Sequence, residues 1–187
     1  MSLKKVAILI SGEGTNAQNI IKTLHDKEIE VTKVISNKAD ANGLNRAKSL
    51  GIKTVAIESK NFSTREEFDK VLVDELQKEP LDLVVLAGFM RILTPIFTQN
   101  IKAINIHPSL LPLFKGSKAI ERSFESDMKV AGVSIHEVTS ELDGGKIIAQ
   151  ECFNKENLDF YEFEKRIHEI EYKLYPKAIV KYLEGIV

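Results

Sequence analysis

Short runs rich in Val, Ile and Leu alternate with helical patterns up to residue 107, and this alternation is the feature that most constrains the fold. Most of these runs are nearly continuous in apolar residues, as expected for parallel strands that helices cover on both faces. The expected strands are residues 5–10, 31–36, 53–57, 82–86 and 103–107. Strand, helix and strand in repetition predict an α/β fold with a doubly wound, mostly parallel sheet.

The helices between these runs carry recognisable start and stop signals. Ser63 and Glu66 have the spacing of a capping box at a helix N-terminus. The apolar residues that follow at helical spacing are Phe68, Val71, Leu72 and Leu76. Another helix is expected before Gly51, because glycine commonly ends a helix at its C-terminus.

The pattern changes after the fifth run. A proline-rich turn precedes a helical segment near residues 117–125. Two further strands are expected at about 129–138 and 146–153, joined by a polar loop that contains Asp143 and Gly144. Because Asp-Gly favours the tight turns of β-hairpins, these strands are expected to form a C-terminal hairpin.

A long helix is expected to close the chain. Asp159 and Glu162 form a second capping-box pattern, and apolar residues follow on one helical face. These residues are Phe160, Phe163, Ile167, Ile170 and Leu174. Because neither an internal repeat nor a Pro/Ser-rich linker divides the sequence, we expect a single domain over residues 1–187.

Charge and composition restrict the partners. The chain has 26 Lys plus Arg against 27 Asp plus Glu, and this formal charge of −1 disfavours a general nucleic-acid or anionic-membrane surface. The apolar runs 6–10 and 83–90 are too short for a signal peptide core and for a membrane-spanning helix. The lone cysteine, Cys152, cannot form an internal disulfide and is interpreted as a small apolar residue rather than a nucleophile. Small-molecule partners and a cytoplasmic location are therefore expected.

Residues 11–16, Ser-Gly-Glu-Gly-Thr-Asn, follow the first expected strand and open a helix. Glycines permit a tight turn, and the free N–H groups at a helix N-terminus favour an anion such as a phosphate. The alternative is that glycine serves only the turn, as it does in many strand-to-helix connections. Glu13, inside the loop, mildly opposes an anion.

The same loop matches a weak dinucleotide fingerprint, Gly12-x-Gly14-x-x-Ala17. A nicotinamide cofactor would also need an acidic residue at the end of the second strand to hold a ribose diol. Here that strand ends in Ser36 and Asn37, which weakens the cofactor hypothesis. Asp40 lies close enough in the sequence to keep the hypothesis open.

Asn105 and His107 are two residues apart on an expected strand, so their side chains leave the same face. They also lie at the carboxyl end of that strand, where open α/β sheets bind ligands. This spacing is consistent with a catalytic pair and with a structural histidine, and Asp143 alone fits an ordinary turn. Together the three side chains would supply an amide donor for an oxyanion, an imidazole that moves a proton and a carboxylate that stabilises its cation.

The remaining histidines show no spacing typical of a metal site, so we expect surface or structural roles for them and no metal in the protein. They are His25, His136 and His168.

Five motifs occur in order along the chain: SGEGTN at 11–16, SNKAD at 36–40, LAGFMRIL at 86–93, NIHPSLLP at 105–112 and ELDGG at 141–145. With these motifs the sequence closely resembles the phosphoribosylglycinamide formyltransferases, also called glycinamide ribonucleotide transformylases, of the folate-dependent formyltransferase family. The resemblance covers essentially the whole chain and implies a Rossmann-like formyltransferase fold.

The resemblance implies that the amine of glycinamide ribonucleotide attacks the formyl carbon of 10-formyltetrahydrofolate, a step of de novo purine (IMP) biosynthesis. A tetrahedral intermediate would collapse to N-formylglycinamide ribonucleotide and tetrahydrofolate. By the same likeness Asn105 would bind the oxyanion, and His107 would donate a proton or act as its electrostatic partner. Asp143 would favour the imidazolium and assist proton transfer through water.

The resemblance also assigns substrate contacts, with the phosphate loop in the N-terminal half. The ribonucleotide contacts are Gly14, Thr15, Asn16 and Glu171. The folate contacts, which lie mainly in 90–143, are Arg65, Met90, Arg91, Ile92, Leu93, Thr139, Ser140, Glu141 and Leu142. An exposed helix position remains an alternative for Arg65. Ordinary core packing remains one for Met90, Ile92 and Leu93. The formyl folate is a co-substrate, and the protein is expected to be a monomer or a homodimer.

Two related enzymes and one unrelated class stay as alternatives. Methionyl-tRNA formyltransferase has similar Asn-x-His and Asp-Gly motifs but brings an extra C-terminal domain and a basic surface for tRNA, neither of which is expected here. Formyltetrahydrofolate deformylase has an added N-terminal domain and usually a histidine where this chain has Pro108. A Rossmann-type nucleotide-binding module without formyl chemistry is the alternative from a different class.

Overall fold

The computed structural model of the protein describes residues 2–187 and forms two compact units. The first unit ends at Ile104 and the second begins at Asn105, so the boundary falls inside β5 (Ala103–His107). The expectation of one domain over the whole chain stays a prediction.

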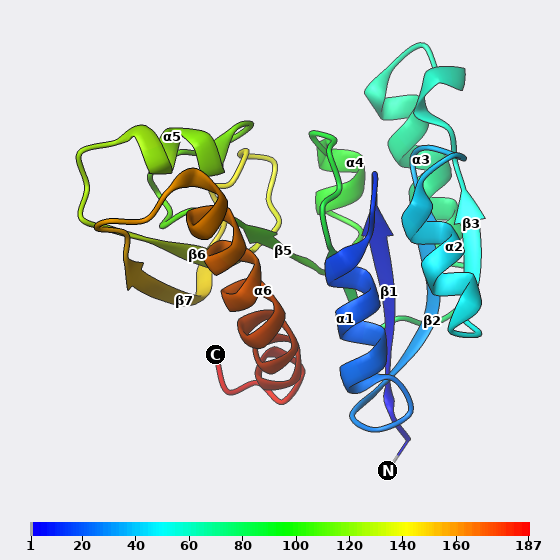
Figure 1. Ribbon diagram of the computed structural model, residues 1–187. Helices are drawn as coiled ribbons and strands as arrows, with labels where there is room; N and C mark the ends of the chain where they lie inside the picture. Colours follow the sequence, from blue (N-terminus) through cyan, green and yellow to red (C-terminus); the bar gives the residue numbers. More distant parts are fainter. Residues whose placement is uncertain (1) are drawn as a thin grey trace. The chain divides into compact units, whose positions relative to one another are not determined.

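The first unit is built on four parallel strands. β1 (Lys4–Ile10) pairs with β2 (Ile29–Ser36) on one side and with β4 (Leu83–Leu86) on the other, and β2 also pairs with β3 (Lys53–Ala56). β1, β2 and β3 lie side by side in Figure 1. The connecting helices are α1 (Thr15–Leu24), α2 (Asn42–Ser49), the short 3-10 helix η1 (Ser59–Asn61), α3 (Arg65–Leu76) and α4 (Pro95–Thr98).

The order of these strands reverses between β1 and β4. Because parallel crossovers are right-handed, the path from β1 through β2 to β3 places α1 and α2 on one face, and the return to β4 places α3 on the other. Consistent with this, α1 packs against α2 and α3 packs against α4. The loops that follow β1 and β4 therefore leave the sheet at a topological switch point, the usual ligand-binding position in such folds.

The core of the first unit explains why the sequence forms a buried parallel sheet. Residues 6–10 of β1 are all 0% exposed, because helices cover both faces of the strand. The amphipathic helix α1 buries the side chains that recur at helical spacing, namely Ala17, Ile20, Ile21 and Leu24.

The second unit contains an antiparallel hairpin of β6 (Val130–Glu137) and β7 (Ile147–Asn154). The long helix α6 (Phe160–Leu183) packs against both strands, and α5 (Ala119–Glu125) packs against α6 (Figure 1). Along the whole chain the strands are hydrogen-bonded in the order β3-β2-β1-β4-β5-β6-β7. The predicted doubly wound, mostly parallel α/β fold with a C-terminal hairpin and a closing helix is thus confirmed.

The start of α3 differs from the prediction by one residue. The capping box is formed by Thr64 and Glu67, not by Ser63 and Glu66. Glu67 Oε2 accepts from the backbone N–H groups of both Ser63 (2.9 Å) and Thr64 (3.3 Å), so this register satisfies two donors with one carboxylate. On the same helix Val71 is 41% exposed, whereas Phe68 is buried as expected.

Two short elements were not predicted, and one apolar face is smaller than expected. η1 and α4 are each too short to show a helical period, although Pro95 at the first turn of α4 is a typical start signal. In α6 the Asp159–Glu162 capping box is present as predicted. Phe160 at the start of that helix is 39% exposed, so the buried face begins at Phe163.

None of the helices among residues 2–187 is both long and apolar enough to cross a membrane.

Candidate functional site

The loop after β1 requires glycine for steric reasons. Gly14 has a φ of 66°, and a Cβ atom on it would lie 2.7 Å from the Cα of Gly43. Gly43 in turn donates its N–H to the carbonyl of Gly12 at 3.0 Å. The loop and the start of α2 therefore pack backbone against backbone, and α1 begins at Thr15 without a side-chain cap.

The carboxylate of Glu13 is hydrogen-bonded and is not a free negative charge in this loop. Its Oε2 accepts from Asn42 Nδ2 at 2.9 Å and from Arg46 at 3.2 Å. These two bonds, Asn42 first and Arg46 second, hold the pKa of Glu13 below its ordinary value. Because Arg46 neutralises the carboxylate, the objection that Glu13 opposes an anion loses much of its force.

The end of β2 does not offer the acidic residue of a dinucleotide site. Asn37 is buried, and its Oδ1 accepts a hydrogen bond from the hydroxyl of Ser11 at 2.5 Å. Asp40, the remaining acidic candidate, is exposed. The Asn37 side chain therefore links the loop after β2 to the loop after β1.

The loop after β4 exposes apolar side chains that sequence alone could not place. Met90 is 80% exposed and Ile92 is 47% exposed, so core packing is wrong for these two residues. Leu93 is 6% exposed and packs in the core. Arg91 lies with its guanidinium carbon 4.7 Å from the centroid of the Phe68 ring, a cation–π contact that orients the loop.

Arg65 occupies the first position of α3 and is exposed. This location agrees with both interpretations of the residue, the helix surface and a folate contact.

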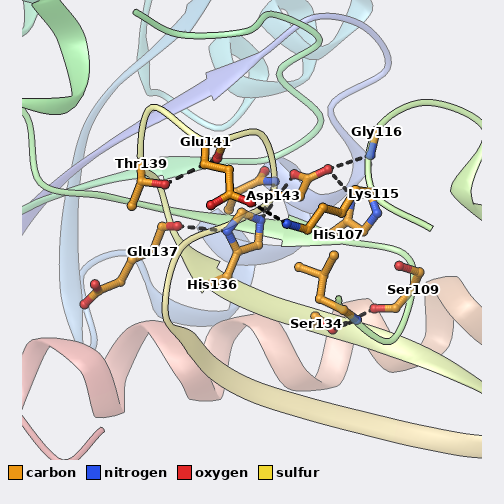
Figure 2. A network of polar contacts seen from close by, with 12 residues as sticks. His107, Ser109, Lys115, Gly116, Ser134, His136, Glu137, Thr139, Glu141 and Asp143 are labelled. Carbon is orange, nitrogen blue, oxygen red and sulfur yellow. Dashed lines mark hydrogen bonds and ion pairs between the residues drawn. The ribbon is translucent and has the colours of Figure 1, made fainter. Parts of the chain in front are cut away.

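In the second unit, His107, His136 and Asp143 belong to one polar cluster (Figure 2). Asn105 joins this cluster through His136. His107 Nδ1 lies 3.5 Å from Asp143 Oδ2, and both side chains are 7% exposed. Asp143 has a φ of 49°, a left-handed conformation that Asp tolerates better than most residues. This backbone conformation turns the loop between β6 and β7 so that the carboxylate is buried beside β5.

Both ring nitrogens of His107 face oxygen atoms that accept hydrogen bonds. Nε2 lies 2.9 Å from the carbonyl oxygen of Phe114, which can only accept, so Nε2 carries a hydrogen. Nδ1 faces the carboxylate of Asp143. The His107 ring therefore has a hydrogen-bond acceptor on each side.

Asp143 is stabilised as a carboxylate despite its burial. Burial by itself raises its pKa, but the His136 ring, the N–H of Gly116 and the charge of His107 together hold that pKa below the ordinary value. The bond from Gly116 N to Asp143 Oδ2 is 2.8 Å long. The cluster therefore pairs a carboxylate with an imidazole in a water-poor setting, where their attraction is strengthened.

His136 also belongs to this cluster, although a surface or structural role was expected for it. Its ring is buried, Nε2 lies 3.2 Å from Asn105 Nδ2 and 3.5 Å from Asp143 Oδ1, and Nδ1 lies 2.8 Å from the carbonyl of Glu137. Ser134 and His136 are two apart on β6, as Asn105 and His107 are on β5. Polar residues two apart in an otherwise apolar strand were the signal that could have identified it.

Ser134 fixes the turn that follows His107. Its hydroxyl donates to the Ser109 carbonyl at 2.7 Å and accepts from Leu111 N at 2.9 Å and Gln150 Nε2 at 2.8 Å. The turn also contains a cis peptide bond before Pro112. These contacts hold the carboxyl end of β5 in place and with it the ring of His107.

The predicted folate residues of the second unit lie on an exposed loop. Thr139, Ser140, Glu141 and Leu142 are all exposed. Glu141 forms an ion pair with Lys115 at 2.7 Å, and Thr139 donates its hydroxyl to the Glu141 carbonyl at 3.3 Å (Figure 2). The loop thus has local order without burying its side chains.

Glu171 is a buried carboxylate on α6. It is 5% exposed, and its Oε2 lies 2.9 Å from Nδ1 of His168. This hydrogen bond is the main reason that the pKa of His168 is raised above its ordinary value. Within residues 2–187 no group of three or more His, Cys, Asp or Glu side chains could hold a metal ion.

The profile of the family described as formyl transferase matches residues 4–179 and so extends over both units. The chain belongs to the formyl transferase family. The family predicted from the five motifs is therefore confirmed, and with it the expectation that the protein is an enzyme.

Relatives with assigned activities support this membership in the formyl transferase family. A phosphoribosylglycinamide formyltransferase of Haemophilus influenzae is 45% identical over 190 residues, which cover 98% of this chain and 89% of that protein. The human trifunctional purine biosynthetic protein adenosine-3 is 40% identical over 188 residues. That alignment covers 98% of this chain but only 19% of the human protein.

Solved structures of the formyl transferase family agree with the fold. A phosphoribosylglycinamide formyltransferase from Campylobacter jejuni is 54% identical, with a TM-score of 0.92 over 97% of this chain and 98% of that one. A glycinamide ribonucleotide transformylase from Symbiobacterium toebii is 37% identical, with a TM-score of 0.93 over 98% of this chain.

Proposed function

We propose that this formyl transferase transfers the formyl group of 10-formyltetrahydrofolate to the amine of glycinamide ribonucleotide, giving N-formylglycinamide ribonucleotide in de novo purine biosynthesis. The observation that carries the proposal is the polar cluster of Asn105, His107 and Asp143 in a chain whose relatives bear this activity in their names. The cluster supplies the donor, the acid and the carboxylate that formyl transfer to an amine requires.

The reaction begins when the neutral amine attacks the formyl carbon. A C–N bond forms, the carbonyl π electrons move to oxygen, and the oxyanion is stabilised by an N–H of Asn105 and by the imidazolium of His107. The amide nitrogen of Asn105 has two hydrogens, so it can donate one to His136 and one to the oxyanion.

Collapse of the intermediate breaks the bond between the formyl carbon and N10 of the folate. N10 takes up a proton as it leaves, while the attacking nitrogen loses one, so protons and electrons balance without an oxidant or a reductant. We propose that His107 supplies the proton and that Asp143, directly or through water, accepts the one released. Asp143 suits this role because its carboxylate is buried beside His107 and is largely shielded from solvent.

For the ribonucleotide we propose two sets of contacts, one for the phosphate and one for the ribose. The backbone N–H groups of Gly14, Thr15 and Asn16 would bind the phosphate at the start of α1, where the helix dipole favours negative charge. Glu171, as a carboxylate, would accept hydrogen bonds from the ribose hydroxyls.

For the folate we propose that exposed apolar side chains cover the pterin ring and that backbone groups read its edge. Met90 and Ile92 fit this role because their apolar side chains are exposed, and exposed apolar side chains that lie together often mark a ligand-binding surface. Leu93 is buried, so it would contribute only its backbone. Arg91 and Arg65 would meet the anionic end of the cofactor, and residues 139–142 would close on the folate from their exposed loop.

We propose small-molecule partners only, no resident metal, a cytoplasmic location, and a monomer or homodimer as the active form.

The direct test mixes purified protein with glycinamide ribonucleotide and 10-formyltetrahydrofolate and follows the folate absorbance. The proposal predicts a spectral change that depends on the ribonucleotide and is absent with glycine or ribose 5-phosphate alone. A change without any acceptor, with release of formate, would support the deformylase alternative instead. If NAD or NADP raised the melting temperature while the ribonucleotide did not, the nucleotide-binding module would be favoured.

A further inference from the structure

The hydroxyl of Ser11 joins the two loops that leave the switch point of the first unit. Ser11 follows β1 directly, and its own N–H donates to the carbonyl of Gly88 at 3.0 Å. The N–H of Met90 donates to Ser11 Oγ at 2.7 Å, and Ser11 Oγ donates to Asn37 Oδ1 at 2.5 Å. Ser11 is 4% exposed and Asn37 is 6% exposed, so solvent does not compete strongly for these bonds.

The direction of each hydrogen bond is fixed by chemistry. A backbone N–H can only donate, so Ser11 Oγ accepts from Met90 N. The hydroxyl hydrogen of Ser11 is then donated to the side-chain amide oxygen of Asn37. The amide of Asn37 then points its nitrogen toward Ser59 Oγ, 3.5 Å away. A side chain without a hydroxyl at position 11 would break both bonds at once.

The second loop is anchored again at its far end. The carboxylate of Asp69, which is 1% exposed on α3, accepts from Thr94 N at 2.6 Å. Between Ser11 and Asp69 the loop carries the exposed residues Met90 and Ile92. Its position is therefore set at one end by α3 and at the other by the residue that begins the glycine loop.

The two loops leave neighbouring strands, because β1 and β4 pair in parallel. Each loop turns at a glycine with positive φ, Gly14 at 66° and Gly88 at 79°. Because Ser11 is hydrogen-bonded to the second loop and begins the first, a shift of one loop can be transmitted to the other.

We propose that Ser11 is a positioning residue that couples the binding of the two substrates. The proposal rests on the proposed function, in which the ribonucleotide phosphate binds at 14–16 and the folate binds at 90–93. A shift of the first loop on ribonucleotide binding would move Ser11 and, through it, the N–H of Met90 at the folate site. By thermodynamic reciprocity the folate would favour ribonucleotide binding by the same factor.

The test measures the affinity of tetrahydrofolate with and without saturating glycinamide ribonucleotide by calorimetry. Tetrahydrofolate carries no formyl group, so the ternary complex cannot react. We expect the ribonucleotide to tighten tetrahydrofolate binding to the unmodified protein by roughly fivefold or more, within the usual range of coupling between sites. In Ser11→Ala this factor should fall to about one, because loss of one buried hydrogen bond is worth up to about tenfold in an equilibrium constant.

Two further variants make the result specific. Ser49→Ala also removes a serine hydroxyl from the first unit, one that donates to the Arg46 carbonyl at 2.8 Å outside this network, and it should keep the full coupling. Asn37→Ala leaves Ser11 Oγ able to accept from Met90 but frees the hydroxyl to rotate, so the coupling should be intermediate. If Ser11→Ala does not fold, as judged by its melting curve, a reduced coupling in Asn37→Ala supports the proposal and a full coupling overturns it.

The outcomes separate this proposal from the one on which it rests. If the unmodified protein binds neither glycinamide ribonucleotide nor tetrahydrofolate, the proposed function fails. If it binds both without mutual influence, or if a folded Ser11→Ala keeps the full coupling, the role of Ser11 is wrong while the function stands.

Discussion

The polar cluster of the second unit is an ordered sequence of donors and acceptors. The carbonyl of Phe114 accepts from His107, and the other side of that ring faces Asp143. Nε2 of His136 lies between the amide nitrogen of Asn105 and Asp143, at 3.2 and 3.5 Å. The carbonyl of Glu137 can only accept, so Nδ1 of His136 carries a hydrogen and Nε2 is the ring nitrogen that faces Asn105 and Asp143.

For single residues of this cluster we predict that substitution lowers turnover but leaves binding of glycinamide ribonucleotide nearly unchanged. His107→Ala and Asn105→Ala should each lower kcat by about 100- to 1,000-fold, as expected for loss of a proton donor or an oxyanion donor. The affinity for glycinamide ribonucleotide, measured by calorimetry, should stay nearly unchanged. His25→Ala serves as the matched control, because His25 accepts from Val31 N at 3.0 Å in the first unit. Near-normal turnover in either active-site variant would remove that residue from the mechanism.

Sequence patterns identified part of this cluster and missed part of it. Asn105 and His107 were found because a two-residue spacing on a strand fixes the face. Asp143 came only from the family resemblance, since Asp-Gly in a loop looks the same whether or not the carboxylate is used. The expected structural role of His136 stays a prediction, but its contacts were not predicted, because they depend on which strands are neighbours and periodicity along one strand does not contain that information.

The start of α3 shows that a capping-box pattern in the sequence does not by itself fix the first residue of a helix. Two overlapping capping boxes are present in the sequence, one from Ser63 and one from Thr64. Both place the same apolar residues on the buried face, so hydrophobic pattern cannot choose between them. The structure selects Thr64, because Glu67 then accepts from two backbone N–H groups.

This assignment predicts different stabilities for two neighbouring variants. Thr64→Ala should lower the free energy of unfolding by about 1 kcal/mol, because it removes the acceptor for Glu67 N. Ser63→Ala removes a hydroxyl that takes no part in the capping box and should change it by less than about 0.5 kcal/mol. Urea unfolding of both variants measures the difference. A larger loss in Ser63→Ala than in Thr64→Ala would return the cap to the position expected from sequence.

Long elements were predictable and short ones were not. Each expected strand is present within about two residues, because a buried parallel strand needs a continuous apolar run. α4 has four residues and η1 three, so neither completes enough turns for a period to appear. The exposure of Met90 and Ile92 was also unpredictable, since an apolar run in a sequence gives no sign that it extends past the end of its strand.

At the scale of the whole molecule, the alternation of strands and helices predicted the fold class but not the order of the strands. The order follows from where the chain reverses direction along the sheet, between β1 and β4. That reversal places the loops after β1 and β4 on neighbouring strands, and these loops carry the proposed phosphate and folate contacts of the first unit. The family profile matches residues 4–179 and so includes residues of both units.

The most direct test of formyl transfer to glycinamide ribonucleotide follows the formyl carbon itself. The protein is incubated with glycinamide ribonucleotide and 10-formyltetrahydrofolate that carries an isotope label in the formyl carbon, and the products are separated and analysed by mass spectrometry. We predict that the label appears in N-formylglycinamide ribonucleotide with the unmodified protein and is almost absent from it with His107→Ala. Recovery of the label as free formate, or its retention on the folate in the presence of the ribonucleotide, would exclude formyl transfer to the ribonucleotide.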